Sequence, residues 1–508
     1  MDFMTEMKKT KDLNTMVYTE NGALGHKTTG KYLLDMNFAV SSLRNMKEAD
    51  IASKFADAFA EDPVLAMRWL FFARDIRGGM GERRLFRVCM KSVAMQSPKL
   101  VEAVIHLVPE YGRWDDLWEL LDINEQLHHR IIFLMKEQLA KDIIHMKRGE
   151  SISILAKWMP SVNTSSEKTR RLARYFAKEL GVTERQYRKV LSGLRNKLNV
   201  TEKMMSAKQW QDIDYQAVPS KANLLYKDAF LRHDEERRNE YLKALQNGKK
   251  KINASTLFPH DVVHKYGWGS KVDVTIEELW KNLPDYVQGN SSTMVVADGS
   301  GSMQTSVGNT SVTAWEVAHS LAIYFAQHSK GPYKNRYITF SSFPQFVTLD
   351  ADNLLDNIRI ARQHSEISNT NIEGVFDLIL DTAIRTNCTQ EAIPQTILIL
   401  SDMEFDTATY GHRHSEFESP SETLFQTIRR KWEKAGYRIP RLVFWNICSR
   451  TGAIPMKENK LGVTLVSGFS PAVCKMVMTN ELDPYKALLD TIMDPRYDAV
   501  ENAVKDIV

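Results

Sequence analysis

Several features that assign proteins to common classes are scarce in this chain. Only four cysteines occur among its 508 residues, Cys89, Cys388, Cys448 and Cys474, and no two of them form a CxxC pair. Scattered cysteines are typical of reduced thiols and argue against a disulfide framework. No apolar run approaches the roughly 18–20 residues of a membrane span, and the polar start of the chain lacks an apolar signal segment. We therefore expect a cytoplasmic protein without membrane partners.

The motifs of common enzyme classes are also missing. The sequence contains no Walker motif and no dinucleotide-binding fingerprint. It also shows no Ser-His-Asp order that we would assign to a catalytic triad. Glu404 and Asp406 follow a strand-like run, but they do not complete the bridging carboxylate set that two-metal phosphoryl chemistry requires. His412 and His414 stand in a polar segment without the further ligands of a zinc site. The expectation is a protein that is not an enzyme.

Length and charge predict more than one domain. Residues 1–288 contain 47 Lys and Arg against 38 Asp and Glu, whereas residues 289–508 contain 20 against 25. A basic half joined to an acidic half suggests an anionic partner for the first half, although compositional drift explains the same imbalance. We predict an N-terminal arm at 1–30, a helical domain at 31–288 and an α/β domain at 289–508.

Helical periodicity dominates the first half from about Leu33 onward. Ile51, Phe55 and Phe59 recur at helical spacing, and Asp62-Pro63 supplies the N-cap and first-position residues of a further helix. Short amphipathic helices joined by short loops predict a helical-repeat array, even though the sequence shows no strict internal period. Helices are expected at 84–94, 99–107, 114–122, 126–146, 168–180, 184–198, 221–230 and 234–247.

The most basic stretch lies at residues 151–200, which hold 11 Lys and Arg against 3 acidic residues. Its cations are interleaved with Tyr175, Phe176 and Tyr187. Because cations neutralise phosphates and aromatic rings stack on unpaired bases, one interpretation is an RNA-binding face, with no DNA partner expected. The alternative is that the rings belong to the core and the charges to a solvated surface. The candidate RNA-binding residues are Lys168, Arg170, Arg171, Arg174, Lys178, Arg185, Arg188 and Lys189.

A glycine-rich turn precedes the helix expected at 84–94. Its three glycines fall within four residues, and the backbone amides of such a turn can cradle an anion. The spacing is not that of a Walker loop, and the plainer alternative is a glycine helix cap with solvated arginines. The candidate anion-binding residues are Arg77, Gly78, Gly79, Arg83 and Arg84.

Strands and helices alternate after residue 289, which is the pattern of a parallel sheet covered by helices on both faces. Apolar runs predict strands at 293–298, 336–341, 396–401, 441–448 and 463–467. Helices are expected at 312–328, 371–385, 421–436, 471–479 and 482–493. The predicted fold class is therefore α + α/β, with helical repeats followed by a doubly wound parallel sheet.

Oxygen-bearing side chains gather at the predicted strand ends. One carboxylate and two hydroxyls follow the first strand, another carboxylate follows the 396–401 strand, and a threonine precedes the helix at 371–385. In open α/β sheets ligands bind beyond the carboxyl ends of the strands. Carboxylates with hydroxyls suit Mg²⁺ or Mn²⁺ and suit zinc poorly. The predicted metal ligands are Asp298, Ser300, Ser302, Thr370 and Asp402.

This Asp298-x-Ser300-x-Ser302 triplet, with Thr370 and Asp402 downstream, resembles the metal-ion-dependent adhesion site of von Willebrand factor A (vWA) domains. The resemblance implies that Ser300 and Ser302 bind the ion directly and that the other three bind it directly or through water. It also implies an open coordination position that an acidic side chain of a protein partner fills. The usual glycine-rich approach to the threonine is replaced here by Ser-Asn.

A helical-repeat domain followed by a vWA domain resembles the Ro autoantigen (TROVE-module) RNA-binding proteins, to which residues 76–83 are similar. A family with a domain of unknown function is more similar still, through blocks at 74–79, 156–161, 443–446 and 466–469. The Ro resemblance implies a HEAT-like helical domain that closes into a ring and binds structured or misfolded noncoding RNA. The two resulting hypotheses are an RNA-binding scaffold and a metal-dependent protein–protein adaptor without RNA binding.

Overall fold

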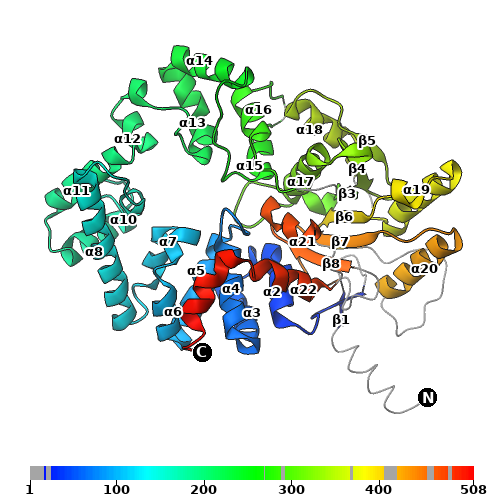
Figure 1. Ribbon diagram of the computed structural model, residues 1–508, viewed down its shortest axis with the longest axis horizontal. Helices are drawn as coiled ribbons and strands as arrows, with labels where there is room; N and C mark the ends of the chain where they lie inside the picture. The colour runs from blue at the N-terminus through cyan, green and yellow to red at the C-terminus, as the bar shows by residue number, and fades with distance from the viewer. Residues whose placement is uncertain are drawn as a thin grey trace. The chain divides into compact units, whose positions relative to one another are not determined.

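The computed structural model describes residues 16–18, 24–267, 269–287, 292–366, 370–404, 420–452, 454, 463–478 and 483–508 (Figure 1). The chain divides into two compact units. The first, called here the sheet unit, comprises Met1–Ala66 and Leu257–Asp494, and the second, the helical unit, comprises Met67–Thr256 and Pro495–Val508. Each unit combines an early and a late part of the chain, so neither follows the linear division at residue 288 that the sequence predicted.

A six-stranded sheet forms the centre of the sheet unit. Its order is β5-β4-β3-β6-β7-β8, and every neighbouring pair is parallel except β4 and β5. The strands are β3 (Thr293–Asp298), β4 (Arg336–Phe340), β5 (Phe346–Thr348), β6 (Thr396–Ser401), β7 (Arg441–Asn446) and β8 (Val463–Ser467). The five predicted strands are confirmed, with ends that agree to within two residues.

The short edge strand β5 makes the sheet mixed, whereas the sequence predicted a parallel one. β5 turns back along β4 after a tight turn, in which Gln345 N donates to the Thr339 hydroxyl at 2.9 Å. Only Val347 of its three residues is buried, so β5 lacks the apolar run that marks the other strands. A connection this short joins antiparallel strands only, because a parallel pair needs a long crossover.

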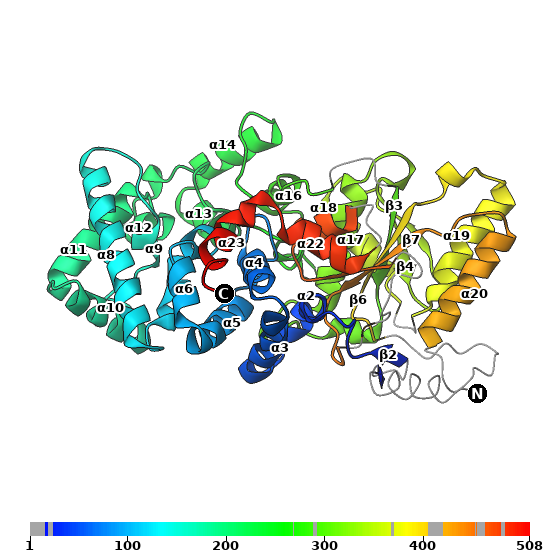
Figure 2. The same cartoon turned by 60° about the horizontal axis from the view of Figure 1, so that its bottom comes forward.

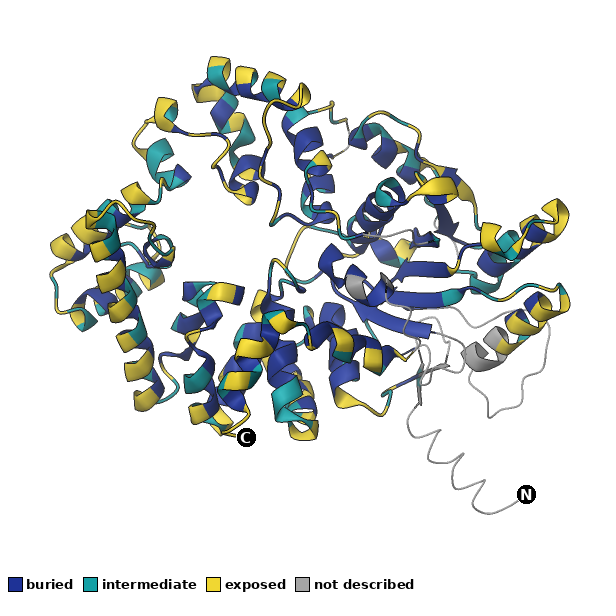
Figure 3. Cartoon of the chain, viewed as in Figure 1, coloured by how far each residue is buried: buried dark blue, intermediate teal, exposed yellow. Residues whose placement is uncertain are grey.

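One face of the sheet is covered by α19 (Ile372–Thr386) and α20 (Pro420–Lys434), which pack side by side (Figure 2). Phe376 of α19 and Trp432 of α20 join a core that includes Ile399 of β6. The central strands β3 and β6 are buried on both faces (Figure 3). Such strands read as continuous apolar runs without alternation, which is why their positions could be predicted.

The opposite face is covered by α17 (Ala314–His328), which lies against β3. Its Phe325 ring is 5.8 Å from the Trp445 ring of β7. Helices on both faces confirm the doubly wound arrangement. The other helices of this unit after residue 257 are α15 (Pro259–Val263), α16 (Val274–Lys281), α18 (Leu354–Gln363), α21 (Cys474–Met478) and α22 (Pro484–Ile492).

Two helices from the start of the chain also belong to the sheet unit, α2 (Tyr32–Leu43) and α3 (Glu48–Glu61). Ser41 N of α2 donates to Ser467 Oγ at the end of β8 at 3.1 Å. Asn446 Nδ2 at the end of β7 donates to Phe38 O at 2.9 Å. Almost every residue of α2 is buried, so this helix is part of the α/β core although its periodicity alone grouped it with the helical domain.

Part of the predicted N-terminal arm forms a small sheet. β1 (Met16–Tyr18) and β2 (Leu24–His26) pair antiparallel. The backbone of His26 exchanges two hydrogen bonds of 2.9 Å with that of Ile454. Residues 1–15 and 19–23 of the predicted arm lie outside the described residues.

The helical unit contains helices and connecting turns throughout its described residues. α4 (Pro63–Arg74) leads into it, and Leu65 N donates to Asp62 Oδ1 at 2.9 Å, which confirms the predicted N-cap. Among the described helices of the whole chain, none is both long and apolar enough to cross a membrane. The further helices are α5 (Arg83–Gln96), α6 (Pro98–Val104), α7 (Val108–Tyr111), η1 (Trp114–Leu120), α8 (Glu125–Lys147), α9 (Leu155–Trp158), α10 (Glu167–Glu179), α11 (Glu184–Lys197), α12 (Thr201–Ser206), η2 (Trp210–Asp212), α13 (Ser220–His233), α14 (Glu235–Gln246) and α23 (Asp498–Val504).

The last residues of the chain complete the helical unit. Asp75, which is fully buried, accepts hydrogen bonds from Arg496 at 3.0 Å and from the Tyr497 hydroxyl at 3.2 Å. Arg68, also buried, pairs with Glu501 at 2.5 Å. Two buried charges, Arg68 on α4 and Asp75 directly after it, thus take partners from residues 495–508. This explains why the segment packs with helices although the sequence placed it in the α/β domain.

Candidate metal centre

The strand order creates a topological switch point, the kind of place at which ligands bind in open α/β sheets. From β3 the chain passes to β4 on one side, whereas β6 pairs with β3 on the other side. The carboxyl ends of β3 and β6 therefore flank a topological switch point. Asp298 is the last residue of β3, and Asp402 directly follows Ser401, the last residue of β6. The backbone thus brings the two predicted carboxylate ligands to one place.

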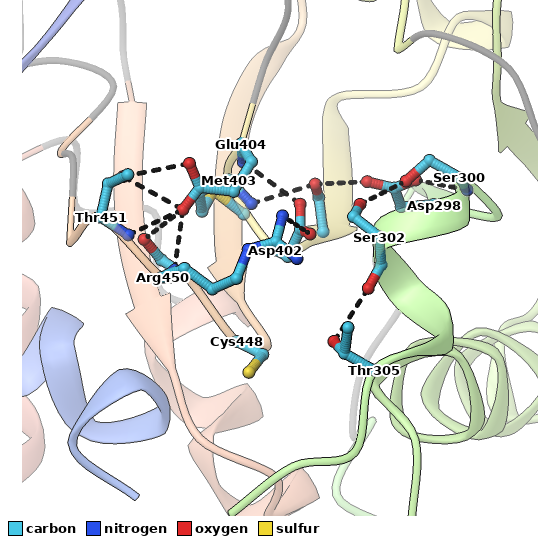
Figure 4. A network of polar contacts seen from close by, with 12 residues as sticks. Asp298, Ser300, Ser302, Thr305, Asp402, Met403, Glu404, Cys448, Arg450 and Thr451 are labelled. Carbon is cyan, nitrogen blue, oxygen red and sulfur yellow. Dashed lines mark hydrogen bonds and ion pairs between the residues drawn. The ribbon is translucent and has the colours of Figure 1, made fainter. Parts of the chain in front are cut away.

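A hydrogen-bonded turn holds the predicted serines over these strand ends (Figure 4). Asp298 Oδ1 accepts a hydrogen bond from Ser300 N at 2.9 Å, and Ser401 Oγ donates to Asp298 Oδ2 at 2.6 Å. The hydroxyl oxygens of Ser300 and Ser302 lie 3.0 Å apart, and the Ser302 side chain also hydrogen-bonds Asp402. Four of the five predicted ligands are therefore in one polar network.

The two carboxylates are buried together, which disfavours their ionised forms. Burial, followed by the charge of Asp402, raises the pKa of Asp298 to about 7. Burial also raises the pKa of Asp402, against the lowering effect of its hydrogen bonds to the Ser302 side chain and the Glu404 amide. The protein alone therefore stabilises the ionised pair poorly, and a cation between the carboxylates and the hydroxyls would supply the missing positive charge.

The loop after β7 brings a positive side chain to the same edge. Glu404 is buried, and its Oε1 accepts hydrogen bonds from Arg450 N at 2.7 Å and Thr451 N at 2.9 Å. This anchor leaves Arg450 Nη2 at 3.3 Å from Asp402 Oδ2. The sequence prediction missed Arg450. The signal that could have found it is the polar segment Ser449–Thr451 after the apolar run at 441–448, the same signal that identified Asp298 and Asp402.

Thr370 lies at the start of α19, which begins at the carboxyl edge of the sheet because it precedes β6. Asn371 caps this helix, since its Oδ1 accepts from Gly374 N at 2.8 Å. Its Nδ2 donates to Ser342 O at 3.2 Å and so ties the helix start to the loop that follows β4. The fifth predicted ligand is therefore placed at the expected edge.

The donor set determines which ion this edge fits. Two carboxylates with serine and threonine hydroxyls are hard oxygen ligands, which favour Mg²⁺ or Mn²⁺. Within the described residues, no three His, Cys, Asp or Glu side chains group as a metal site, so the hydroxyls are needed to complete the set. Asp406, His412 and His414 lie outside the described residues.

A family model described as a domain of unknown function, DUF2828, matches residues 19–126 and 122–297, which together span more than half of the chain. The chain belongs to the DUF2828 family. A second model, the domain of unknown function DUF7788, matches residues 292–502. The DUF2828 protein is also 32% identical over 514 residues to the uncharacterised protein L728 of Acanthamoeba polyphaga mimivirus, covering 94% of this chain and 87% of that protein. The predicted relationship to a domain-of-unknown-function family is confirmed, and the vWA and TROVE resemblances stay predictions.

In the helical unit of this DUF2828 protein, the predicted RNA-binding residues occupy α10 and α11. Most of them are exposed, and the four exposed ones on α10 follow one another at three- or four-residue steps, which places them along one side of the helix. Arg170 differs, since it is half-buried and donates to Thr164 O at 2.8 Å and Ser165 O at 3.1 Å. We define the α10–α11 face by the exposed residues Lys168, Arg171, Arg174, Lys178, Arg185, Arg188 and Lys189.

The aromatic rings of the same stretch serve the core. Phe176 and Tyr187 are buried, and the Tyr187 hydroxyl donates to Pro160 O at 2.9 Å. The half-buried Tyr175 places its hydroxyl 2.6 Å from His128 Nε2. The alternative that assigned these rings to the core therefore fits the structure, and Phe176 and Tyr187 are not available to stack on bases.

The glycine-rich turn is built by its own backbone. Gly79 N and Gly81 N donate to Asp75 O at 3.2 and 3.1 Å, so two of its amides are already occupied. A Cβ atom on Gly79 would lie 1.9 Å from Phe72 O, so close packing requires glycine there. This geometry favours the structural alternative over the predicted cradle of amides. The other predicted members of the site are the half-buried Gly78 and the exposed Arg77, Arg83 and Arg84.

Proposed function

We propose that this DUF2828 protein is a non-enzymatic docking protein whose sheet unit binds Mg²⁺ or Mn²⁺ and, through the ion, an acidic side chain of a partner protein. The observation that carries the proposal is the meeting of buried Asp298 and Asp402 at the switch point of the sheet, with the hydroxyls of Ser300 and Ser302 beside them. Once bound, the ion supplies a Lewis-acidic position for a carboxylate oxygen.

The vWA-like interpretation of the sheet unit belongs to this proposal. Three features support it: the DxSxS triplet after β3, the aspartate after β6 and the threonine at the start of α19. Asp298, Ser300, Ser302, Thr370 and Asp402 are the residues that would hold the ion. The protein would supply a fixed set of oxygen ligands for the ion. We expect it to bind its partner without converting it chemically.

Calorimetric titration with Mn²⁺ tests the ion site. Asp298→Asn keeps the shape of the side chain and removes its charge. We expect it to weaken Mn²⁺ binding by about 100-fold or more, because even outer-shell partners of a metal contribute about 10–100-fold. The matched control is Asp356→Asn on α18, which removes an exposed carboxylate paired with Arg359. Equal Mn²⁺ affinities of the wild type and Asp298→Asn would exclude the proposed site.

A second candidate function is RNA binding by the helical unit, and the α10–α11 face favours it. This face carries seven exposed cations on two successive helices. Since Phe176 and Tyr187 are buried, we propose that contacts to phosphates, rather than base stacking, supply the affinity. The Ro-like interpretation of the helical unit rests on the same observation.

The RNA proposal predicts a strong dependence on salt. Triple charge reversal at Arg171, Arg174 and Arg188 should weaken the binding of a structured RNA by about tenfold or more near physiological salt and flatten the salt slope. Lys54→Glu, Lys91→Glu and Lys99→Glu together, at exposed positions on α3, α5 and α6, make the same change in net charge and serve as the control. A control variant that weakens binding as much as the triple variant would show that the α10–α11 face has no special role.

A further inference from the structure

Three hydrogen-bonded side chains of the sheet unit have no part in the proposed docking function. Ser311 Oγ lies 3.0 Å from His264 Nε2, and Nδ1 of the same ring lies 3.0 and 3.1 Å from the two carboxylate oxygens of Glu316. His264 is 47 residues from Ser311 and 52 from Glu316, so no local sequence pattern connects them. We call these residues the serine triad. A serine, a histidine and a carboxylate joined in this order are an arrangement that activates a serine hydroxyl.

The partners of the histidine ring assign its tautomer. An ionised carboxylate only accepts hydrogen bonds, so Nδ1, the ring nitrogen that faces Glu316, carries the proton. In the neutral ring Nε2 then has a free electron pair, and it accepts the hydrogen bond that Ser311 Oγ donates. The hydroxyl proton is therefore directed at a base within hydrogen-bond reach, which is the geometric requirement of general-base activation.

The start of α17 fixes the carboxylate independently of the histidine. Glu316 Oε2 accepts from Thr313 N at 2.8 Å, and Thr313 Oγ1 accepts from Glu316 N at 3.2 Å, which together form a capping box. The side chains of Glu316 and His264 are 14% and 30% exposed. The carboxylate is thus held in a largely buried position, from which it orients the imidazole ring.

The loop that carries Ser311 is closed by its own hydrogen bonds. Val307 N donates to Val312 O at 2.9 Å, and the Thr310 hydroxyl donates to Val307 O at 2.7 Å. Ser311 itself is exposed. The loop therefore presents the hydroxyl to solvent in a defined position, where an external reagent can reach it.

The backbone amide of Ser311 is available for the negative charge that develops on a carbonyl oxygen under attack. Among the described residues, no group accepts a hydrogen bond from Ser311 N. Such stabilisation is a large part of acyl-transfer catalysis, since one donor contributes about 100- to 1,000-fold to the rate. Aryl esters and thioesters need less of it than peptide bonds, because their leaving groups depart more readily. The site therefore fits activated acyl donors.

We propose that Ser311 is an acyl-acceptor site of this DUF2828 protein, activated by His264 and positioned by Glu316. Ser311 Oγ attacks the carbonyl carbon of an aryl ester or thioester and passes its proton to His264 Nε2. A bond forms between Oγ and this carbon, and the bond from the carbon to the leaving oxygen or sulfur breaks. The leaving group departs with the bonding electron pair and takes the proton from Nε2, which returns the ring to its neutral state.

The protein is the acceptor in this reaction, so acylation goes beyond the docking function without replacing it. The product is a serine ester on the loop before α17, and the partner bound at the sheet edge is not converted. Ser311, His264 and Glu316 are not among the five proposed metal ligands. Acylation of Ser311 should therefore proceed at the same rate with and without a chelator.

Acetylation of the full chain by p-nitrophenyl acetate tests the proposal. Peptide mass spectrometry compares the rate at Ser311 with the rate at Ser306, an exposed serine of the same loop. We expect Ser311 to react about 100-fold faster or more, because a positioned general base contributes about 10²–10⁴-fold. Ser311→Ala should abolish the fast acetylation, whereas Ser306→Ala should leave it unchanged.

Two variants separate activation from folding. Glu316→Gln keeps the capping box, since glutamine serves there as glutamate does, but it removes the charge that stabilises the imidazolium. Acetylation of Ser311 should slow by about tenfold or more while circular dichroism stays unchanged. His264→Gln removes the base and should lower the rate at Ser311 to that at Ser306. The control is His364→Gln, which changes a half-buried histidine that contacts Ile360 O at 2.9 Å and should react as the wild type.

Equal acetylation rates at Ser311 and Ser306 in the wild type would overturn the proposal and leave the metal-dependent docking function untouched. A folded Glu316→Gln variant that acetylates at the wild-type rate would also overturn it, because the serine triad would then only join α15 to α17. Slower acetylation of Ser311 in the presence of a chelator would contradict an acceptor site independent of the metal centre.

Discussion

Charged side chains have opposite environments at the carboxyl edge of the sheet, where Asp298 and Asp402 lie, and on the α10–α11 face of the helical unit. At the edge, Asp298 and Asp402 are buried and placed together by the ends of two strands. On the face, Arg174 Nε lies 3.2 Å from Glu184 Oε1, and the two side chains are 55% and 53% exposed. Desolvation costs several kcal/mol for a buried ion and little for an exposed one, so only the buried charges demand a specific partner.

The two regions support the two proposed functions to different degrees. Two buried carboxylates with raised pKa values support the proposal of one particular ligand, a hard cation. A row of exposed cations indicates only that anionic partners are favoured. If burial causes this difference, substitution of a buried charge should change the free energy of unfolding much more than substitution of an exposed charge.

The largest effect is expected at Asp116, a fully buried carboxylate of the helical unit. It accepts hydrogen bonds from Arg74 Nε at 2.8 Å and Arg87 Nε at 2.7 Å. Asp116→Ala leaves the guanidinium of Arg74 buried without this partner, and should lower the free energy of unfolding by about 3–5 kcal/mol. Urea unfolding followed by circular dichroism measures the change. A loss of less than about 1 kcal/mol in the free energy of unfolding would show that this buried ion pair contributes little more to stability than an exposed one.

An intermediate effect is expected from Asp298 in the metal-free protein. Its folded pKa, about 7, is above the ordinary value, so the folded state binds the proton more tightly than the unfolded state. Stability should therefore fall as pH rises from about 4 to about 7, by on the order of 3 kcal/mol. Asp298→Asn should remove the part of this pH dependence that comes from Asp298, leave the smaller part that comes from Asp402, and be more stable than the wild type at pH 7 without metal.

Urea unfolding in the presence of a chelator, measured at several pH values across this window, checks the sign. The matched control is Asp356→Asn. Hydrogen bonds from Asn353 and Arg359 lower the pKa of Asp356, so this carboxylate does not contribute a loss of stability as pH rises. A metal-free wild type that gains stability as pH rises through the window would contradict the assignment.

The smallest effect is expected at Glu184. Glu184→Ala removes an exposed ion pair with Arg174 and should change the free energy of unfolding by less than about 0.5 kcal/mol. The same variant exposes one more uncompensated cation on the α10–α11 face, so RNA binding should be unchanged or slightly tighter. Comparison with Asp116→Ala in the same unit isolates burial as the variable.

Features that depend on local sequence were predictable from the sequence alone. The strands buried on both faces appear as apolar runs, and the side chains that follow them could be assigned to one edge by topology. This was sufficient to predict that Asp298, Ser300, Ser302 and Asp402 lie together. The helices of the first half were predictable for the same reason, since amphipathic spacing and caps such as Asp62 are local signals.

Features that depend on distant contacts were not predictable. Arg68 finds Glu501 more than 400 residues away in the sequence, and α2 joins the sheet through hydrogen bonds such as that from Ser41 to Ser467. Nothing in the local pattern distinguishes these partners from others of the same type. The polar segment after the run at 441–448 marks the position of Arg450, but its partner was not predictable, because only the loop that Glu404 organises brings it to Asp402.

The most direct test of the central claim, that the buried carboxylates of the sheet unit require a divalent cation, is thermal unfolding at pH 7 with increasing Mg²⁺. The wild type should gain about 2.7 kcal/mol when Mg²⁺ reaches about 100 times its dissociation constant, and Asp298→Asn should gain nothing over the same range. Without Mg²⁺ the variant should be the more stable protein, and with saturating Mg²⁺ this order should reverse. Equal responses of the two proteins to Mg²⁺ would contradict the claim.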